Sequence, residues 1–375
     1  MENFQVNIFG VISIFGTLQG LILASIFIFN ENYARKSNRY LSILLLICSV
    51  INFMGTLEEA DMYNEYDVLH FLPVRFFSLI APVVYFFVQY LINPNYQFKR
   101  WGYFLFLPFV LDYSFQCYEI VSFLLGNLDV QEDIWLHYMI NNSFETIGAI
   151  FNIMITIIAI KMIWAYEKSL YNEYAEISDK SLKWLFNTLI GGSLLTLFWL
   201  GMAIDDFFPN FIDVNLGWVI WLGVSILIYW IGYSMLMRPE IFIEEKFIAE
   251  EIILNEETKL SDKTDEHYSK LLNLMKEEEL FRNPNLNMGV LANAIGLSKG
   301  YLSQIINAKE GKNFFDFVNT YRVEDVKQKL RDASFDHFNI LGIALEAGFK
   351  SKSTFNSVFK KMTGKTPSQF KNHRN

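Results

Sequence analysis

Residues 343–371, IALEAGFKSKSTFNSVFKKMTGKTPSQFK, predict two helices joined by a tight turn. Gly348 stands where the chain leaves the first helix and needs a positive φ, which glycine adopts at the lowest cost. In the second helix Phe355, Phe359 and Met362 recur at steps of four and three residues, so they share one buried face. The stretch therefore predicts a helix-turn-helix whose second helix is amphipathic.

The opposite face of that second helix is polar and basic, and it contains Lys352, Asn356, Ser357, Lys360 and Lys361. In DNA-binding proteins a helix-turn-helix places such a second helix in the major groove. The sequence therefore predicts a recognition helix near the C-terminus.

Another helix-turn-helix is predicted upstream. Leu291 lies on the apolar side of its first helix, Gly296 makes the turn, and Ser298 can cap its second helix, 299–307. Residues 314–330 are expected to form one stiff helix between the two motifs. One chain would then place two recognition helices in successive major-groove faces, which recur about every 34 Å.

These residues resemble the signature of the arabinose-operon-regulator (AraC/XylS) family. The matching positions of the C-terminal motif are Ile343-Ala344, Gly348-Phe349, Ser353-x-Phe355, Phe359-Lys360, Gly364-x-Thr366-Pro367 and Phe370-Lys371. Those of the upstream motif are Leu291-Ala292, Ser298, Tyr301-Leu302-Ser303 and Phe314-x-Asp316-Phe317-x-x-x-Tyr321-Arg322. The resemblance implies a DNA-binding domain with two helix-turn-helix motifs. Gly300 departs from the family, because relatives often have a bulky base-contacting residue there, and Val326 replaces the usual alanine.

The residue types on the two recognition helices predict how each contacts double-stranded DNA. Asparagine and glutamine pair with adenine and lysine with guanine, so base-edge contacts are expected from Lys299, Ser303, Gln304, Lys352, Ser353, Asn356 and Ser357. Phosphate contacts, or packing, are expected from Arg322, Lys360, Lys361 and Lys365.

Charge is divided unevenly along the 375-residue chain, whose net charge is −9. Residues 1–237 hold 10 basic and 20 acidic side chains, and residues 238–280 hold 6 and 13. Residues 281–375 hold 15 basic and 7 acidic side chains, the positive balance that phosphate contacts require. The electrostatics of a DNA-binding domain are thus confined to the C-terminal part.

The rest of the chain is strongly apolar; over the whole sequence 52% of residues are hydrophobic and 19% are charged. Seven apolar runs fill the first 237 residues, at 9–29, 40–57, 71–92, 101–117, 144–164, 182–204 and 216–237. A helix needs roughly 17–25 residues to cross a bilayer, and each run is about that long. The sequence predicts a seven-helix transmembrane bundle in a lipid bilayer.

The loops between these runs alternate in charge. Basic residues lie in the first, third and fifth loops, at Arg35, Lys36, Arg39, Lys99, Arg100, Lys161, Lys168, Lys180 and Lys183, whereas the even-numbered loops are acidic. By the positive-inside rule the odd loops are cytoplasmic. We therefore expect a multi-pass protein of the inner (cytoplasmic) membrane, with its N-terminus outside and its C-terminal domain in the cytoplasm.

Several charged residues lie within or near the apolar runs: Arg75, Asp112, Glu119, Glu145 and Lys161. Charges inside a membrane are costly and often mark a ligand or ion path. Arg75 and Lys161 lie near the ends of runs and fit the alternative that they extend to the interface. Asp112 and Glu145 are the candidates for sensing an unknown small-molecule or envelope signal.

Three parts follow from these patterns: a sensor-like membrane domain at 1–237, an acidic amphipathic helical linker at 238–266, and the DNA-binding domain at 267–375. In the linker Ile243, Phe247, Glu250 and Leu254 recur at helical spacing, on an apolar face that is broad and partly interrupted. That stripe fits a stalk or the seam of a homodimer, and equally a surface helix against the membrane or a neighbouring helix.

The combined prediction is an all-α, membrane-embedded transcription regulator. The spacing of cysteines, histidines and nucleophiles indicates no catalytic or metal site, so neither an enzyme activity nor a cofactor is expected. Two alternatives stay open: a transporter or enzyme with a DNA-binding appendix, and a regulator that is released by proteolysis.

Overall fold

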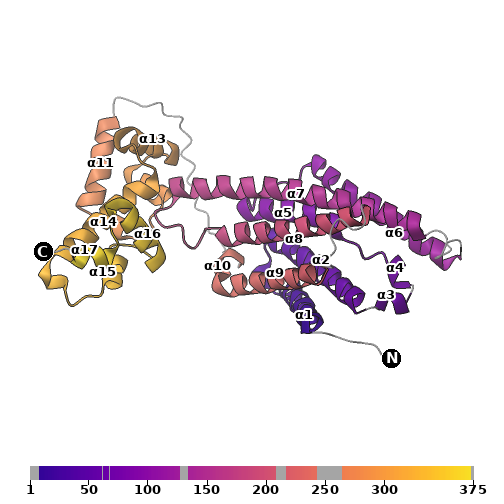
Figure 1. Ribbon diagram of the computed structural model, residues 1–375. Coiled ribbons are helices and arrows are strands. Elements are labelled where there is room, and N and C mark those ends of the chain that lie inside the picture. The colour runs from indigo at the N-terminus through magenta and orange to yellow at the C-terminus, as the bar shows by residue number, and fades with distance from the viewer. Residues whose placement is uncertain are drawn as a thin grey trace. The chain divides into compact units, whose positions relative to one another are not determined.

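The computed structural model describes residues 8–60, 62–66, 68–126, 134–207, 217–242 and 264–372. Within them the chain is helical apart from turns and one isolated antiparallel bridge between Tyr174 and Asn287 (Figure 1). The all-α fold class is confirmed. The chain forms two compact units, Met1–Trp164 with Leu182–Lys246 and Ala165–Ser181 with Phe247–Asn375.

The first unit contains the long apolar helices. Its elements are α1 (Ile8–Phe29), α2 (Lys36–Glu59), α3 (Met62–Glu65), α4 (Val68–Phe71), α5 (Ile80–Ile92), α6 (Leu107–Leu124), most of α7 (Ile134–Glu173), α8 (Lys183–Phe207), α9 (Gly217–Met237) and α10 (Pro239–Phe242). Among the described residues, six helices are long and apolar enough to cross a membrane. The predicted run 71–92 is shorter: Pro73 disfavours helix before it, and the apolar helix there spans Phe77–Ile92.

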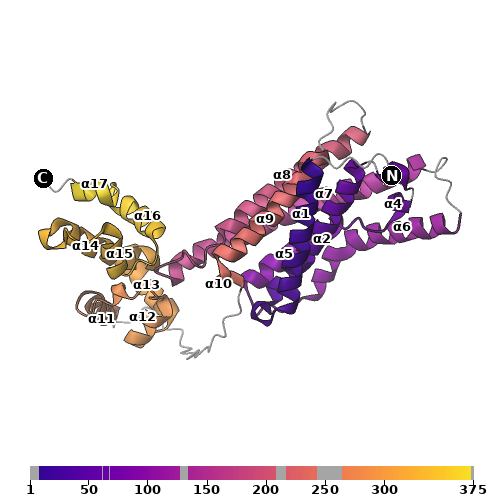
Figure 2. The ribbon, with the colours of Figure 1, turned by 90° about the horizontal axis from the view of Figure 1, so that it is seen from below.

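Close backbone approach holds α1, α2 and α9 together, and Figure 2 shows these helices side by side. A Cβ atom at Gly16 would lie 2.6 Å from the Ser225 Cβ, and one at Gly55 would overlap the Trp221 ring. Asn52 Nδ2 donates to Ser225 Oγ at 3.0 Å, which adds a buried polar link between α2 and α9. Small residues at crossings and hydrogen bonds between helices are typical of packing in lipid.

The first unit differs from a soluble protein in its apolar surface and in the polar groups within its mostly apolar interior. Its surface exposes large apolar side chains, among them Phe29 at 82% and Phe104 at 76% of their area. Its interior holds Asn52, Asp112 and Glu119, each no more than 3% exposed. Extended apolar surface of this kind marks an interaction with a membrane or a partner.

The second unit contains two helix-turn-helix motifs around a central helix. Its elements are α11 (Thr264–Lys276), the 3₁₀ turn η4 (Leu280–Arg282), α12 (Met288–Ile295), α13 (Lys299–Glu310), α14 (Phe314–Arg331), the turn η5 (Ala333–Phe335), α15 (Ile340–Glu346), α16 (Lys352–Thr363) and α17 (Pro367–Asn372). The upstream motif is α12–α13 and the C-terminal motif is α15–α16. The expected bridging helix at 314–330 is confirmed as α14.

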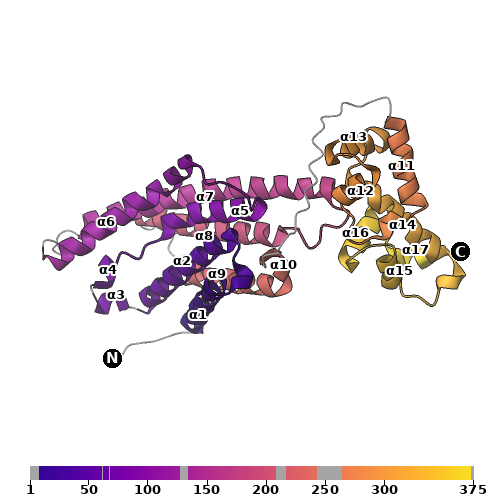
Figure 3. The same ribbon diagram turned by 180° about the vertical axis from the view of Figure 1, so that it is seen from behind.

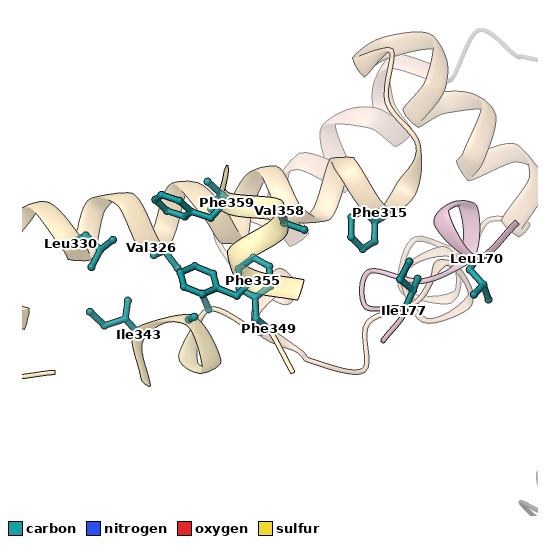
Figure 4. Packing of buried hydrophobic residues seen from close by; sticks show 13 residues of the cluster. Leu170, Ile177, Phe315, Val326, Leu330, Ile343, Phe349, Phe355, Val358 and Phe359 are labelled. Atoms are coloured by element: carbon teal, nitrogen blue, oxygen red, sulfur yellow. The ribbon is translucent and has the colours of Figure 1, made fainter. Parts of the chain in front are cut away.

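Helix α14 joins two apolar cores, as its position between the motifs in Figure 3 shows. Phe314 and Phe317 pack with the upstream motif, whereas Phe315 and Val326 pack with the C-terminal motif. Figure 4 shows the second core, in which Phe349, Phe355, Val358 and Phe359 lie against α14. The 18 residues of α14 span about 27 Å, so one rigid element supports both motifs.

The segment Ala165–Ser181, here called the inserted segment, belongs to the second unit although α8 and α9 follow it in the chain. It includes the end of α7, which runs to Glu173 and so extends well past the predicted end at residue 164. Leu170 and Ile177 of this segment enter the core around α14 (Figure 4). The predicted division at residue 237 therefore leaves out a part of the second unit.

The predicted linker at 238–266 lies mostly outside the described residues, which omit 243–263. The stripe of Ile243, Phe247 and Leu254 falls in that gap, so stalk, homodimer seam and surface helix stay predictions. At the linker's end, α11 begins at Thr264, slightly before the predicted start of the domain at 267.

Replacing Phe355 by alanine is expected to unfold or loosen the C-terminal motif. The ring is 1% exposed and packs on Phe349 and Phe359, and truncating such a residue costs about 3–5 kcal/mol. Pulse proteolysis of the full-length protein in denaturant measures the effect. Asn356→Ala, one residue along but exposed, is the control and should leave the midpoint unchanged; equal midpoints for both variants would contradict the assigned helix faces.

Candidate nucleic-acid interface

The turn of the C-terminal motif requires glycine at position 348 for two reasons. Gly348 has φ 96°, and a Cβ atom there would lie 2.6 Å from the Phe281 carbonyl oxygen and 2.9 Å from that of Arg282. The predicted positive φ at Gly348 is therefore confirmed, and the close approach explains why the turn sits tightly against η4. Phe349, which follows, is 1% exposed and anchors the turn in the core.

Helix α16 presents a continuous polar face. Ser351 caps the helix by accepting from the Thr354 backbone N–H at 3.1 Å. Its exposed side chains are Lys352, Ser353, Asn356, Ser357, Lys360 and Lys361. All four base-contacting candidates predicted for this helix thus share one accessible face, opposite the buried Phe355, Val358 and Phe359.

Helix α13 presents a smaller face. Ser298 caps it by accepting from the Tyr301 N–H at 3.3 Å; Lys299 and Gln304 are exposed, and Ser303 is half-buried. Asn307, one turn beyond Ser303, is also exposed and donates to the Ser303 carbonyl at 2.9 Å. Asn307 is a further candidate for DNA contact that was not predicted, although its three- and four-residue spacing from Gln304 and Ser303 places it on the same face.

Gly300 leaves a gap on that face. A Cβ atom at Gly300 would have no heavy atom within 4 Å, so a larger side chain fits without displacing anything. The stem of Lys299 instead lies over Gly289, where an added Cβ would come within 2.9 Å of the Lys299 Cε. Helix α13 therefore offers fewer base-reaching groups than α16.

Three of the lysines expected at phosphates are accessible. Lys360 and Lys365 are exposed near the C-terminal end of α16. Lys361 is 61% exposed and forms a 2.7 Å ion pair with Asp316 of α14. This pair bridges the recognition helix and the central helix, and it leaves most of the Lys361 side chain in solvent.

Of the two roles predicted for Arg322, the structure contradicts phosphate contact and supports packing, because its side chain is 0% exposed. Its guanidinium donates to three backbone carbonyls: Nε to Phe281 at 2.8 Å, Nη2 to Asn283 at 2.9 Å and Nη1 to Ala175 at 3.4 Å. Burial lowers the pKa of Arg322 to about 10, and nearby Glu176 raises it in part. Arg322 is thus a charged structural centre of the unit.

A second polar site lies inside the first unit. Asp112 of α6 accepts from Ser78 Oγ and from Gln116 Nε2, both at 2.9 Å. The Gln116 amide in turn bonds the backbone of Arg75, which joins α6 to the segment before α5. The predicted sensing candidate Asp112 is therefore buried, and each of its carboxylate oxygens accepts a hydrogen bond.

Arg75 belongs to this buried site as well. It pairs with Glu119 at 2.8 Å and donates to Asn141 of α7 at 2.7 Å, and Asn141 donates to Glu119 at 2.9 Å. The expectation that Arg75 extends to an interface missed this network. Glu145 is half-buried. It lies close enough to the Tyr63 hydroxyl to interact with it electrostatically, and so does Arg75.

Comparisons with known proteins agree with the geometry of the second unit. The sequence model of a family described as "Helix-turn-helix domain" matches residues 291–373. The probable transcription factor PqrA of Proteus vulgaris is 33% identical over 95 residues, which cover 25% of this chain and 75% of that protein. An uncharacterized HTH-type transcriptional regulator of Staphylococcus aureus is 33% identical over 96 residues, 26% of this chain and 12% of the relative.

A solved structure is also similar. A protein of unknown function from Listeria innocua is 28% identical and is covered over 94% of its length by 28% of this chain, with a TM-score of 0.25. The two relatives align with about a quarter of this chain, and the Staphylococcus aureus protein is matched over only 12% of its own length.

Arg322→Met is expected to destabilise the second unit. The change keeps a long side chain but leaves the Phe281 and Asn283 carbonyls without this donor, at a cost of about 3 kcal/mol or more. Denaturant unfolding of the full-length protein, followed by proteolysis of the second unit, measures the effect. Lys360→Met, on the exposed face, is the matched control; an equally mild effect for both would refute the structural role of Arg322.

Proposed function

Because the chain belongs to the helix-turn-helix transcription regulators with an AraC-type DNA-binding domain, we propose that it is a membrane-embedded regulator that couples a signal to sequence-specific promoter binding. The observation that carries the DNA-binding part is the polar face of α16, whose four candidate base-reading side chains are all exposed. The signal would act at the membrane or outside it.

Direct base contacts are assigned to both recognition helices. Helix α16 contributes Lys352, Ser353, Asn356 and Ser357, and α13 contributes Lys299, Ser303 and Gln304. Lys360, Lys361 and Lys365 would neutralise phosphates and fix the orientation on the duplex. Because Gly300 lacks a side chain, α16 is expected to supply more of the sequence discrimination than α13.

Membrane insertion of the first unit is supported by its apolar surface. Exposed Phe29, Phe104 and Trp164 suit lipid. Buried Asn52 bonds Ser225, and buried Asp112 bonds Ser78 and Gln116, so these polar groups are satisfied within the protein. Removing these apolar side chains from water stabilises by about 25 cal/mol per Å². Six helices of sufficient length, with the shorter Phe77–Ile92 as a seventh, would form the spans.

The orientation is supported by the composition of the second unit. The inserted segment belongs to the predicted cytoplasmic fifth loop, and it packs in one unit with the DNA-binding helices. Both therefore lie on the same side of the membrane. The two apolar helices between them, α8 and α9, make an even number of crossings, which fits this arrangement.

Signal sensing is assigned to the buried polar site of the first unit. Asp112 and Glu145 belong to it on sequence grounds, and the Arg75–Glu119 pair adds a second charged centre. The pair is partly buried, with Glu119 buried and Arg75 24% exposed, and such a charged pair among apolar helices would rearrange when one partner is neutralised or displaced. The class of signal stays open between a small molecule and an envelope component.

The first test is chromatin immunoprecipitation of the tagged full-length protein, beside membrane fractionation of the same cells. Full-length protein in the membrane fraction that enriches discrete promoters is the expected result. Asn356→Ala should lower the enrichment more than Gln304→Ala, since a lost bidentate base contact costs about 1–3 kcal/mol. Failure of the wild-type protein to enrich any promoter would refute the proposal, and enrichment by a soluble fragment alone would indicate proteolytic release.

Phosphate contact is tested separately by salt dependence. Lys360→Gln should weaken binding to every DNA fragment alike and reduce the slope of log K against log salt by about 1. Fluorescence anisotropy with the enriched promoter fragment and a scrambled fragment measures both quantities. Lys270→Gln, an exposed lysine on α11 paired with Glu266, is the control; identical slopes for the two variants would rule out a phosphate contact by Lys360.

A further inference from the structure

The inserted segment contacts both helix-turn-helix motifs and the central helix α14 through three consecutive residues. Tyr174 forms the antiparallel bridge with Asn287, and the Ala175 N–H donates to the Leu286 carbonyl at 3.3 Å. Leu286 and Asn287 immediately precede α12, and Asn287 is its N-cap. The upstream motif is therefore bonded through its backbone to a segment that lies more than a hundred residues earlier in the chain.

The Ala175 carbonyl contacts the central helix. It accepts from Asn319 Nδ2 at 3.0 Å and from Arg322 Nη1 at 3.4 Å. Ala175, Asn319 and Arg322 are all 0% exposed, so water cannot replace these bonds. A buried donor that loses its acceptor lowers the free energy of unfolding, because water does not replace the acceptor. The inserted segment therefore helps to hold α14 in position.

Glu176 contacts the C-terminal motif. Its carboxylate accepts from Thr354 Oγ1 at 2.7 Å and from the Lys350 N–H at 3.4 Å, and a further bond comes from the Ser178 N–H at 3.1 Å. Glu176 is 6% exposed, and it attracts the buried guanidinium of Arg322. A carboxylate beside the first turn of α16 is also favoured by the helix dipole.

Apolar packing adds to these bonds. Leu170 and Ile177 enter the core that Phe355, Val358 and Phe315 form, as Figure 4 shows for the side chains around α14. An exposed ion pair between Lys350 and Asp179 at 3.3 Å lies at the edge of the contact. The segment is thus held by buried polar bonds and by core packing together.

We infer that the inserted segment is a built-in part of the DNA-recognition machinery, in which Glu176 is a positioning residue that sets α16 relative to α13. This inference rests on the proposed DNA recognition by α13 and α16. A consequence is that a fragment starting at Thr264 lacks an element that its recognition helices require. A signal that displaces the end of α7 would then alter the spacing of the two helices directly.

The distance between the recognition helices tests this without DNA. Spin labels are attached at Ala308→Cys on α13 and Ser357→Cys on α16, both exposed, in full-length protein with Cys48→Ala and Cys117→Ala. Double electron–electron resonance measures the distance between the two labels. It should give one narrow distance distribution for this background and for the control Glu173→Ala, an exposed position three residues from Glu176. Glu176→Ala should broaden or shift it; an unchanged distribution would overturn the inference.

DNA binding provides the second readout, with the promoter fragment that the wild-type protein enriches as the probe. Glu176→Ala should weaken binding about tenfold, and Asn356→Ala should cost less in that background than alone, because α16 is already displaced. Additive effects would overturn the inference. If circular dichroism shows that Glu176→Ala does not fold, Thr354→Val is used instead, because it removes the same hydrogen bond from the other partner. The spin-label distances and the DNA affinity are then measured with that variant.

Failure of the proposed function looks different. If the wild-type protein binds no promoter, DNA regulation is refuted, whereas the spin-label distances still decide whether the inserted segment positions α16.

Discussion

The second unit depends on the complete burial of one positive charge. A guanidinium without water costs several kcal/mol unless neighbouring groups replace its hydration. For Arg322 those groups are the carbonyls of Phe281 and Asn283, in and directly after the η4 turn, and that of Ala175 in the inserted segment. The Phe349 ring lies 5.7 Å from the same guanidinium. The buried guanidinium needs all of these partners in place. This requirement fixes the relative positions of α14, η4, the inserted segment and the turn before α16.

The helices of the two units differ in the residue types that their outer faces expose. In the second, Phe355 and Phe359 face inward and Asn356 and Lys360 face outward, as in a soluble protein. In the first, glycines and buried polar residues add to an apolar interior at the contacts between helices, and many large apolar side chains also face out. The difference explains why one chain contains both a strongly basic surface and an unusually apolar one, each suited to a different surrounding.

Local features were predictable from the sequence, and features that join distant segments were not. Gly348 and the spacing of Phe355 and Phe359 act within a few residues, so the C-terminal motif followed from its own stretch. An arginine on an amphipathic helix looks the same whether it faces phosphate or carbonyls, and Ala175 is 147 residues from Arg322. The Arg75–Glu119 pair spans 44 residues in the same way. The assigned DNA contacts remain predictions, because an accessible side chain does not by itself determine which base or phosphate it contacts.

The discontinuous construction of the second unit also orders the protein's synthesis. Ala175 leaves the ribosome 147 residues ahead of Arg322, roughly 7–30 s earlier at 5–20 residues per second. In that interval α8 and α9 are made, and both are long apolar helices. Contacts of such sequence separation form late and slowly. The unit that recognises DNA can therefore close only after the last apolar helices have been made, so an incompletely synthesised chain cannot yet present a finished pair of recognition helices.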